Sequence, residues 1–475
     1  MSNDDKKRYL ILKDSNIYKG LIILAIPLML NNLLKTFHDI IDMFFVARIP
    51  GEGTNGVAAI QLTFPIMFTF ISLGIGLSVA GTALISQFVG SGQKADARKY
   101  ASQLLSLSII VGIVLFVLSY FGAELIIKTM GIDPSNSPAD QFIYDNSIAY
   151  LKIRAFEMPF MFMFFAFMAI RQASGDTVWP VIISGTAIVI NTILSPILIQ
   201  VYGLGVPGAA YATVIANVVI MPFGFYLLFF AKSGITVTIP LMKLESGVVR
   251  DIVRTAIPAS LGQAITAIGF YLMNGIIYSY GPETVAAFSV GNRISSMILH
   301  PVMAIGGVAS AYIGQNIGAQ NTERAKATHA KSMILSVCLM AVGSAFLIYV
   351  RRPLAGIFIV DNLFALDLAS EYMFYLLIGM PLMAIFQAFM GTYNGTGNTK
   401  YSLILSVLRL WGMRIPLVIF MREFTDLGSS GIWYAILISN FLIGIVGYML
   451  YLRIDFKPKI SISESIKPVQ AKAVA

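Results

Sequence analysis

The sequence predicts an all-α polytopic membrane protein with about twelve transmembrane helices in two six-helix bundles. Of its 475 residues, 57% are hydrophobic and 12% are charged, and this charged fraction is about half that of a soluble domain. Apolar windows of roughly 20 residues, long enough to cross a bilayer, recur along the whole chain. Short motifs of the first half also return in the second half, in the same order.

The expected spans form two sets. The first set covers residues 19–47, 57–89, 98–121, 146–170, 178–201 and 206–231. The second set covers residues 251–280, 284–316, 327–350, 368–392, 401–421 and 430–453. The polar segments around them divide the chain into a tail (1–18), an N-lobe (19–231), a linker (232–250), a C-lobe (251–453) and a second tail (454–475). We expect the second tail to be unstructured after Asp455.

The two halves repeat at a distance of roughly 220 to 230 residues. Ala25-Ile26-Pro27 returns as Ala256-Ile257-Pro258, and Met158-Pro159 returns as Met380-Pro381. An even number of helices in each half keeps the halves in one orientation, so we expect a pseudo-twofold axis along the membrane normal. Such repeats favour secondary transport. Pro27, which a membrane helix tolerates as a bend, is the expected hinge.

The charge distribution predicts the topology. The chain has a formal net charge of +9, and its Lys and Arg residues concentrate in loops on the side of the N-terminus. We therefore expect a multi-pass protein of the cell (plasma or inner) membrane with both termini cytoplasmic. The N-terminal stretch lacks a cleavage-site pattern and is interpreted as a retained tail. The single Cys338 excludes an intrachain disulfide framework, and no basic patch with interleaved aromatics indicates nucleic-acid binding.

The first span carries an unusual group of ionisable residues, namely Lys35, His38, Asp39 and Asp42. On one helix they cluster over two turns. Charged groups inside a membrane are costly and usually mark ion or substrate pathways. Asp42 is interpreted as a carboxylate that binds a cation or proton, with an ion pair to Lys35 as the alternative. For Asp39 the pair with Lys35 is favoured, and His38 is either a proton shuttle or an ordinary helix neighbour.

The ordered motifs resemble the multidrug and toxic compound extrusion (MATE) family over nearly the whole chain. The resemblance is carried by Pro27, Ile41-Asp42-Met43-Phe44-Phe45-Val46, Gly90 with Arg98, Arg171 with Gly175-Asp176-Thr177, Asn191-Thr192-Ile193-Leu194-Ser195-Pro196 and Gly205-Val206-Pro207-Gly208-Ala209-Ala210. It implies an antiporter that expels organic, often cationic compounds in exchange for H⁺ or Na⁺, without a cofactor. The stretch 256–280 lacks an acid, which resembles the DinF-like branch with coupling in the N-lobe.

The resemblance also implies a cation-coupling site. Asp42 matches the acid of the first helix, and Asn191 and Thr213 match its polar partners on helices five and six. Ser195 stands where many relatives have Asp or Asn, and Asp39 is a weaker member of the set. Asp42, Asn191 and Thr213 could hold Na⁺, because hard cations prefer oxygen ligands. The alternatives are helix-packing hydrogen bonds for Asn191 and bonds of the two hydroxyls to their own helices.

A substrate cavity is expected between the lobes. Its candidate lining residues are Lys35, His38, Phe64, Met67, Met168 and Arg293. Met and aromatic side chains suit an adaptable apolar pocket, although lipid-facing bulk is the ordinary role for such residues on a membrane helix. Arg409 and Arg414 could favour an anionic or zwitterionic substrate over a simple cation.

These observations predict an efflux antiporter for small organic molecules, in contact with membrane lipids, without nucleic-acid partners and monomeric. The alternative is a flippase for lipid-linked glycan precursors. An intramembrane enzyme has little support, because the sequence contains no HExxH, paired GxGD or GxSxG motif.

Overall fold

The computed structural model describes residues 3–130, 133–231, 233–359 and 362–461, without the side chains of 3–5 and 36–43. The fold-class prediction is confirmed. The described residues form helices and no strands, and eleven helices are long and apolar enough to cross a membrane, or twelve when one bent pair counts as a span.

The helices follow the expected spans closely. The first half contains α2 (Ile17–Val46), α3 (Gly53–Ser91), α4 (Lys94–Lys128), α5 (Pro138–Ala155), α6 (Met158–Ala173), α7 (Val178–Pro196) with the π-helical turn η1 (Ile197–Val201), and α8 (Gly205–Phe230). The second half contains α9 (Ser246–Tyr278), α10 (Pro282–Gly318), α11 (Thr322–Gly356), α12 (Leu363–Gly395), α13 (Thr399–Val407) with the π-helical segment η3 (Leu408–Arg414) and α14 (Ile415–Phe424), and α15 (Ser430–Tyr451). We refer to α2–α8 as the N-lobe and to α9–α15 as the C-lobe. The linker between them contains the 3₁₀ turn η2 (Ile239–Met242).

The fourth span differs from the single helix expected at 146–170. It consists of α5 and α6, which meet at an angle of 50°. Pro159 stands in the first turn of α6, where its missing N–H is tolerated but where it cannot continue a preceding helix. The chain between the two helices carries Glu157, whose side chain is buried.

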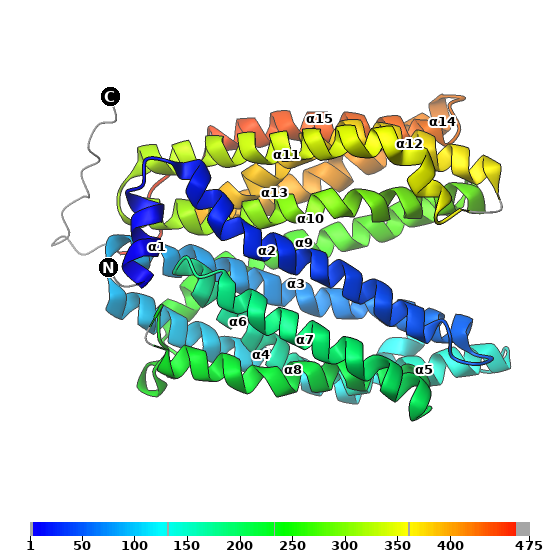
Figure 1. Ribbon diagram of the computed structural model, residues 1–475, viewed down its shortest axis with the longest axis horizontal. Coiled ribbons are helices and arrows are strands. Elements are labelled where there is room, and N and C mark those ends of the chain that lie inside the picture. Colours follow the sequence, from blue (N-terminus) through cyan, green and yellow to red (C-terminus); the bar gives the residue numbers. More distant parts are fainter. Residues whose placement is uncertain (1–2, 131–132, 232, 360–361, 462–475) are drawn as a thin grey trace.

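The two lobes meet at one end of the molecule and diverge toward the other (Figure 1). A Cβ on Gly90 would overlap the carbonyl oxygen of Gln315, and a Cβ on Gly318 would overlap that of Gln87. Both contacts need glycine because backbone approaches backbone. Gly90 and Gly318 are equivalent positions of the repeat, and so are Gln87 and Gln315. Each lobe therefore makes the same glycine–glutamine contact with the other lobe. We call this end of the molecule the sealed end.

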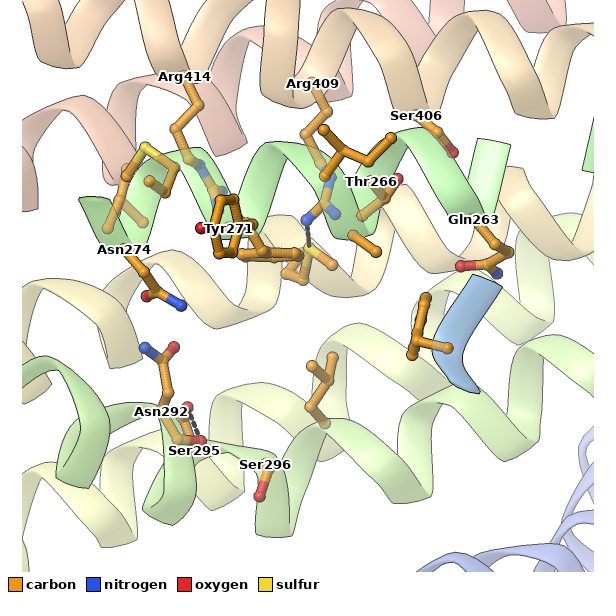
Figure 2. A pocket seen from close by; sticks show the side chains of 18 of the residues that line it. Gln263, Thr266, Tyr271, Asn274, Asn292, Ser295, Ser296, Ser406, Arg409 and Arg414 are labelled. Carbon is orange, nitrogen blue, oxygen red and sulfur yellow. Dashed lines mark hydrogen bonds between the residues drawn. The ribbon is translucent and has the colours of Figure 1, made fainter. Parts of the chain in front are cut away.

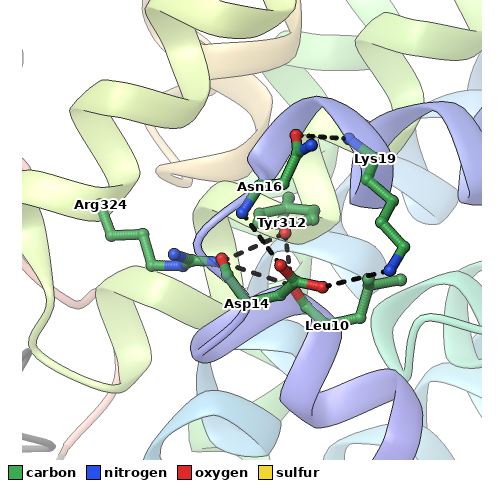
Figure 3. A network of polar contacts seen from close by, with 6 residues as sticks. All are labelled: Leu10, Asp14, Asn16, Lys19, Tyr312 and Arg324. Atoms are coloured by element: carbon green, nitrogen blue, oxygen red, sulfur yellow. Dashed lines mark hydrogen bonds and ion pairs between the residues drawn. The ribbon is translucent and has the colours of Figure 1, made fainter. Parts of the chain in front are cut away.

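The N-terminal tail forms a helix that is anchored at the sealed end. This helix, α1 (Asn3–Leu12), precedes α2 and packs against α10 (Figure 1). Arg324 donates from Nε to the carbonyl of Ile11 at 2.9 Å. It also donates from Nη2 to the carbonyl of Asp14 at 2.7 Å, and the Tyr312 hydroxyl donates to the carbonyl of Leu10 at 2.6 Å (Figure 3). Helix C-terminal carbonyls lack partners within the helix, and these donors satisfy them.

The C-terminal segment also packs against the sealed end, at least as far as Ser461. The Lys459 amide donates to Gln87 Oε1 at 2.8 Å, and Asn398 Nδ2 donates to the Asp455 carbonyl at 3.1 Å. Ile460 is buried. The expected loss of structure after Asp455 is therefore wrong for residues 456–461, because backbone bonds of Lys459 and Ser461 to Gln87 and Gln93 hold them to the N-lobe, while residues 462–475 lie outside the described part.

Candidate functional site

The N-lobe contains a buried chain of polar side chains on α7 and α8. Ser195 donates to Asn191 Oδ1 at 3.1 Å, and Asn191 Nδ2 donates to Thr213 Oγ1 at 3.0 Å. Asn217 Nδ2 continues the chain with a bond to the Thr213 carbonyl at 3.1 Å. The structure thus brings together three residues that the sequence assigned to cation coupling. Their oxygen atoms are hard ligands of the kind that Na⁺ prefers.

A carboxylate that the sequence interpretation missed ends this chain. Glu157 is 4% exposed and accepts a bond from Asn217 Nδ2 at 2.9 Å. Its other oxygen lies 2.8 Å from Arg154 Nε in an ion pair. The signal was available, because Glu157 directly precedes Met158-Pro159, a repeat motif that marks the break between α5 and α6.

Three ionisable residues of the first span lie outside the described side chains. They are His38, Asp39 and Asp42, whereas the backbone of α2 is described. α2 packs against α7, η1 and α8, the elements that carry the polar chain. Lys35 is exposed on α2, and Pro27 lies inside this continuous helix.

A second polar feature is a cavity of about 890 Å³ between α3 and the C-lobe. Its wall combines aromatic and Met side chains with amides and hydroxyls, among them Gln263, Asn274, Asn292 and Ser296 (Figure 2). It also contains the guanidinium groups of two arginines, described below. No Asp or Glu occurs among the described residues that line it.

Arg409 is 5% exposed and Arg414 is 6% exposed, and both line the cavity. The Arg414 guanidinium donates to Ser439 Oγ at 3.1 Å and to Asn440 Oδ1 at 2.6 Å. The Arg409 guanidinium lies over the rings of Phe386 and Phe270, at 4.5 and 5.9 Å from their centroids. Cations are attracted to aromatic faces, but a ring does not neutralise the charge.

The predicted cavity residues fall in different places. Phe64 lines the cavity and is 58% exposed. Met67 is buried in the hydrophobic core of the N-lobe, and Met168 is half-buried on α6. Arg293 is exposed on α10 and is absent from the described cavity wall, whereas its neighbour Asn292 belongs to it.

Comparison with known proteins gives the family. The MatE family model matches residues 27–197 and 258–420, one segment in each half. The chain belongs to the MATE family. A crystal structure titled as a MATE in complex with MaL6 has a TM-score of 0.88 and 24% identity, and the match covers 94% of this chain and 98% of that one. That likeness supports the fold.

Curated relatives of this MATE chain span nearly its whole length. The probable multidrug resistance protein YoeA of Bacillus subtilis is 26% identical, and the match covers 88% of this chain and 90% of that protein. The multidrug export protein MepA of Staphylococcus saprophyticus is 24% identical, with 92% and 94% covered. The FAD transporter of Shewanella oneidensis is 26% identical, with 92% and 95% covered. This MATE protein is therefore a membrane transporter and not an enzyme.

Proposed function

We propose that this protein exports small organic compounds in exchange for H⁺ or Na⁺ and that the exchange is coupled in the N-lobe. The observation that supports it most directly is the buried chain of Ser195, Asn191 and Thr213 on helices that pack against α2. Neutral polar groups in membrane helices commonly serve packing, whereas a carboxylate inside a membrane is costly and usually marks an ion or substrate pathway. Asp42 is placed on α2 by the sequence, and its carboxylate would supply a charge that Ser195, Asn191 and Thr213, which are neutral, lack.

The same arrangement supports alternating access. Binding of a cation at Asp42 would change the contacts of α2 with α7 and α8, and Pro27 would give α2 a place to bend. A cation shifts an equilibrium between two states only by its difference in affinity for them. The sealed end, which we place on the cytoplasmic side with both termini, would have to separate in the second state.

A proteoliposome assay tests this function. Purified protein is reconstituted, and transport of the fluorescent cation rhodamine 123 is followed with a Na⁺ gradient alone and then with a pH gradient alone. We expect one gradient to drive transport in the wild type and Asp42→Asn to lower the rate by about tenfold or more. Asp367→Asn is the matched control, because this exposed carboxylate pairs with Arg352 on the surface of the C-lobe.

Transport at the wild-type rate by a well-folded Asp42→Asn protein would contradict coupling at this position. If neither a Na⁺ gradient nor a pH gradient drives transport, the result would contradict the antiport mechanism and favour the flippase alternative for lipid-linked glycan precursors. The names of the relatives include multidrug export and FAD transport, so the class of compound has to be argued from the cavity.

A further inference from the structure

We propose that the cavity between α3 and the C-lobe binds organic anions, with Arg409 and Arg414 holding the anionic group and the aromatic wall holding an apolar ring system. The binding step stands independently of the coupling site in the N-lobe. Only the transport of such an anion rests on the exporter function proposed above.

The first argument is how η3 places the two arginines. They are five residues apart, and on an α-helix they would be separated by about 140° around the axis. The π-helical segment Leu408–Arg414 contains one residue more in each turn, which brings residues five apart close to one face. Figure 2 shows both side chains extending from this segment toward the same space, with Asn292 on its opposite side. Such π-helical segments are frequent at functional sites.

The second argument is electrostatic. Among the described residues, the hydrogen-bond partners of the Arg414 guanidinium are neutral, namely the Ser439 hydroxyl and the Asn440 amide oxygen. Arg409 has a contact of 3.4 Å with the Met383 sulfur, and its Nε has no hydrogen-bond partner among the described residues. Buried charges are normally paired, because desolvation without compensation is costly. With no described acid in the wall, an anionic ligand is the group that would compensate both.

The third argument is the shape and chemistry of the wall. Aromatic rings stack and Met side chains adapt to irregular shapes, and both kinds surround the arginines. Phe270 and Phe386 flank Arg409, and the Tyr271 ring extends into the cavity (Figure 2). A guanidinium binds carboxylate, sulfonate or phosphate oxygens in two-point geometry. The wall therefore fits an aromatic compound that carries one such group.

A purely structural role explains Arg414 better than Arg409. Arg414 ties η3 to α15 through Ser439 and Asn440, so its replacement would loosen the C-lobe. Arg409 makes no hydrogen bond to a neighbouring oxygen among the described residues. Arg409 is therefore the residue on which a binding role and a packing role can be separated.

The test compares two dyes with the same xanthene skeleton and opposite charge. Fluorescein, an anion at pH 7.4, and rhodamine 123, a cation, are titrated with purified protein in phosphatidylcholine nanodiscs, and binding is followed by fluorescence anisotropy. We expect fluorescein to bind the wild type and Arg409→Gln to weaken it by about tenfold. Arg409→Lys, which keeps the charge but loses the planar fork, should fall between them.

A second variant avoids the arginines. Ser296 on α10 lines the cavity, is half-buried and bonds to the carbonyl of Arg293, so Ser296→Glu adds a carboxylate to the wall without removing a contact of either arginine. We expect it to weaken fluorescein binding by several-fold relative to Ser296→Gln, the control of the same size without the charge, and to leave rhodamine 123 binding unchanged or tighter. Fluorescein affinity that is equal in the wild type, Arg409→Gln and Ser296→Glu overturns the proposal, as does absence of fluorescein binding to the wild type. If the wild type binds fluorescein but neither ion gradient drives rhodamine 123 transport, the result would contradict only the exporter function.

Discussion

Asn217 of the N-lobe and Asn440 of the C-lobe stand at equivalent positions of the repeat, but they bind groups of opposite charge. Asn217 donates to the carboxylate of Glu157 at 2.9 Å, whereas Asn440 accepts from the guanidinium of Arg414 at 2.6 Å. The repeat position of Glu157 is occupied in the C-lobe by Gly379, where a Cβ would lie 3.3 Å from Asn440 Nδ2. An amide suits both lobes because it can donate and accept.

At the sealed end the lobes are instead alike. The contacts of Gly90 with Gln315 and of Gly318 with Gln87 are the same contact made twice. The comparison indicates that the repeat keeps the contact between the lobes symmetric and allows the two interiors to differ in charge. A transporter that handles a cation in one lobe and an anion in the other requires this division.

The largest expected effect is at the sealed end. Gly90→Val and Gly318→Val each place a side chain into the backbone of the opposite lobe, and overpacking of this kind typically costs about 1–3 kcal/mol. We expect both variants to lose thermal stability and export in the same proportion, measured by Trp fluorescence unfolding and proteoliposome transport. Gly307→Val on α10 is the control, since nothing lies within 4 Å of its Cβ. Unequal losses would contradict the reciprocal contact.

A comparable effect on stability, with a more selective effect on function, is expected at the two asparagines. Asn217→Ala and Asn440→Ala each remove a bond to a buried charged group, which typically costs about 1–3 kcal/mol. Thermal unfolding should show similar losses for both, compared with Asn146→Ala, whose amide bonds to its own helix. Function should separate them: we expect Asn440→Ala to weaken fluorescein binding and Asn217→Ala to reduce driven rhodamine 123 transport. If Asn217→Ala instead weakened fluorescein binding and Asn440→Ala reduced rhodamine 123 transport, the proposed difference between the lobes would be wrong.

The smallest expected effect comes from giving the C-lobe an acid where the N-lobe has one. Gly379→Asp places a carboxylate next to Asn440, the residue that binds Arg414, and we expect fluorescein affinity to fall about fivefold, corresponding to roughly 1 kcal/mol for a partly screened pair. Gly379→Asn has the same size without the charge and is the control. Equal affinity in the two variants would show that charge at this position has no influence on the cavity.

Most of the fold could be predicted from the sequence, because hydropathy and the repeat both report on the bilayer. Pro159 lies within the expected fourth span, but a proline only permits a bend, and the 50° angle between α5 and α6 depends on packing. The N-terminal helix was missed because its residues are polar on average. Its anchors, Arg324 and Tyr312, lie three hundred residues away in the sequence.

The candidate site was predictable only in part. Asn191, Ser195 and Thr213 were found through the resemblance, and their hydrogen bonds bring them together. Glu157 was missed because it stands in a window dense in Phe and Met, where one acid does not change the hydropathy. The common orientation of Arg409 and Arg414 was not predictable, because it depends on a π-helical segment for which helix periodicity gives no signal.

The two chain ends have a consequence for experiments in living cells. Lys7 of α1 pairs with Asp176 of the N-lobe while Arg324 of the C-lobe holds the end of the same helix, and residues 455–461 likewise bridge Gln87 and Asn398. Separation of the lobes at this end must release one anchor of each segment. Cleavage of these segments by a protease produced in the cytoplasm would therefore occur mainly in the opened state, and its rate would report how often the transporter visits that state.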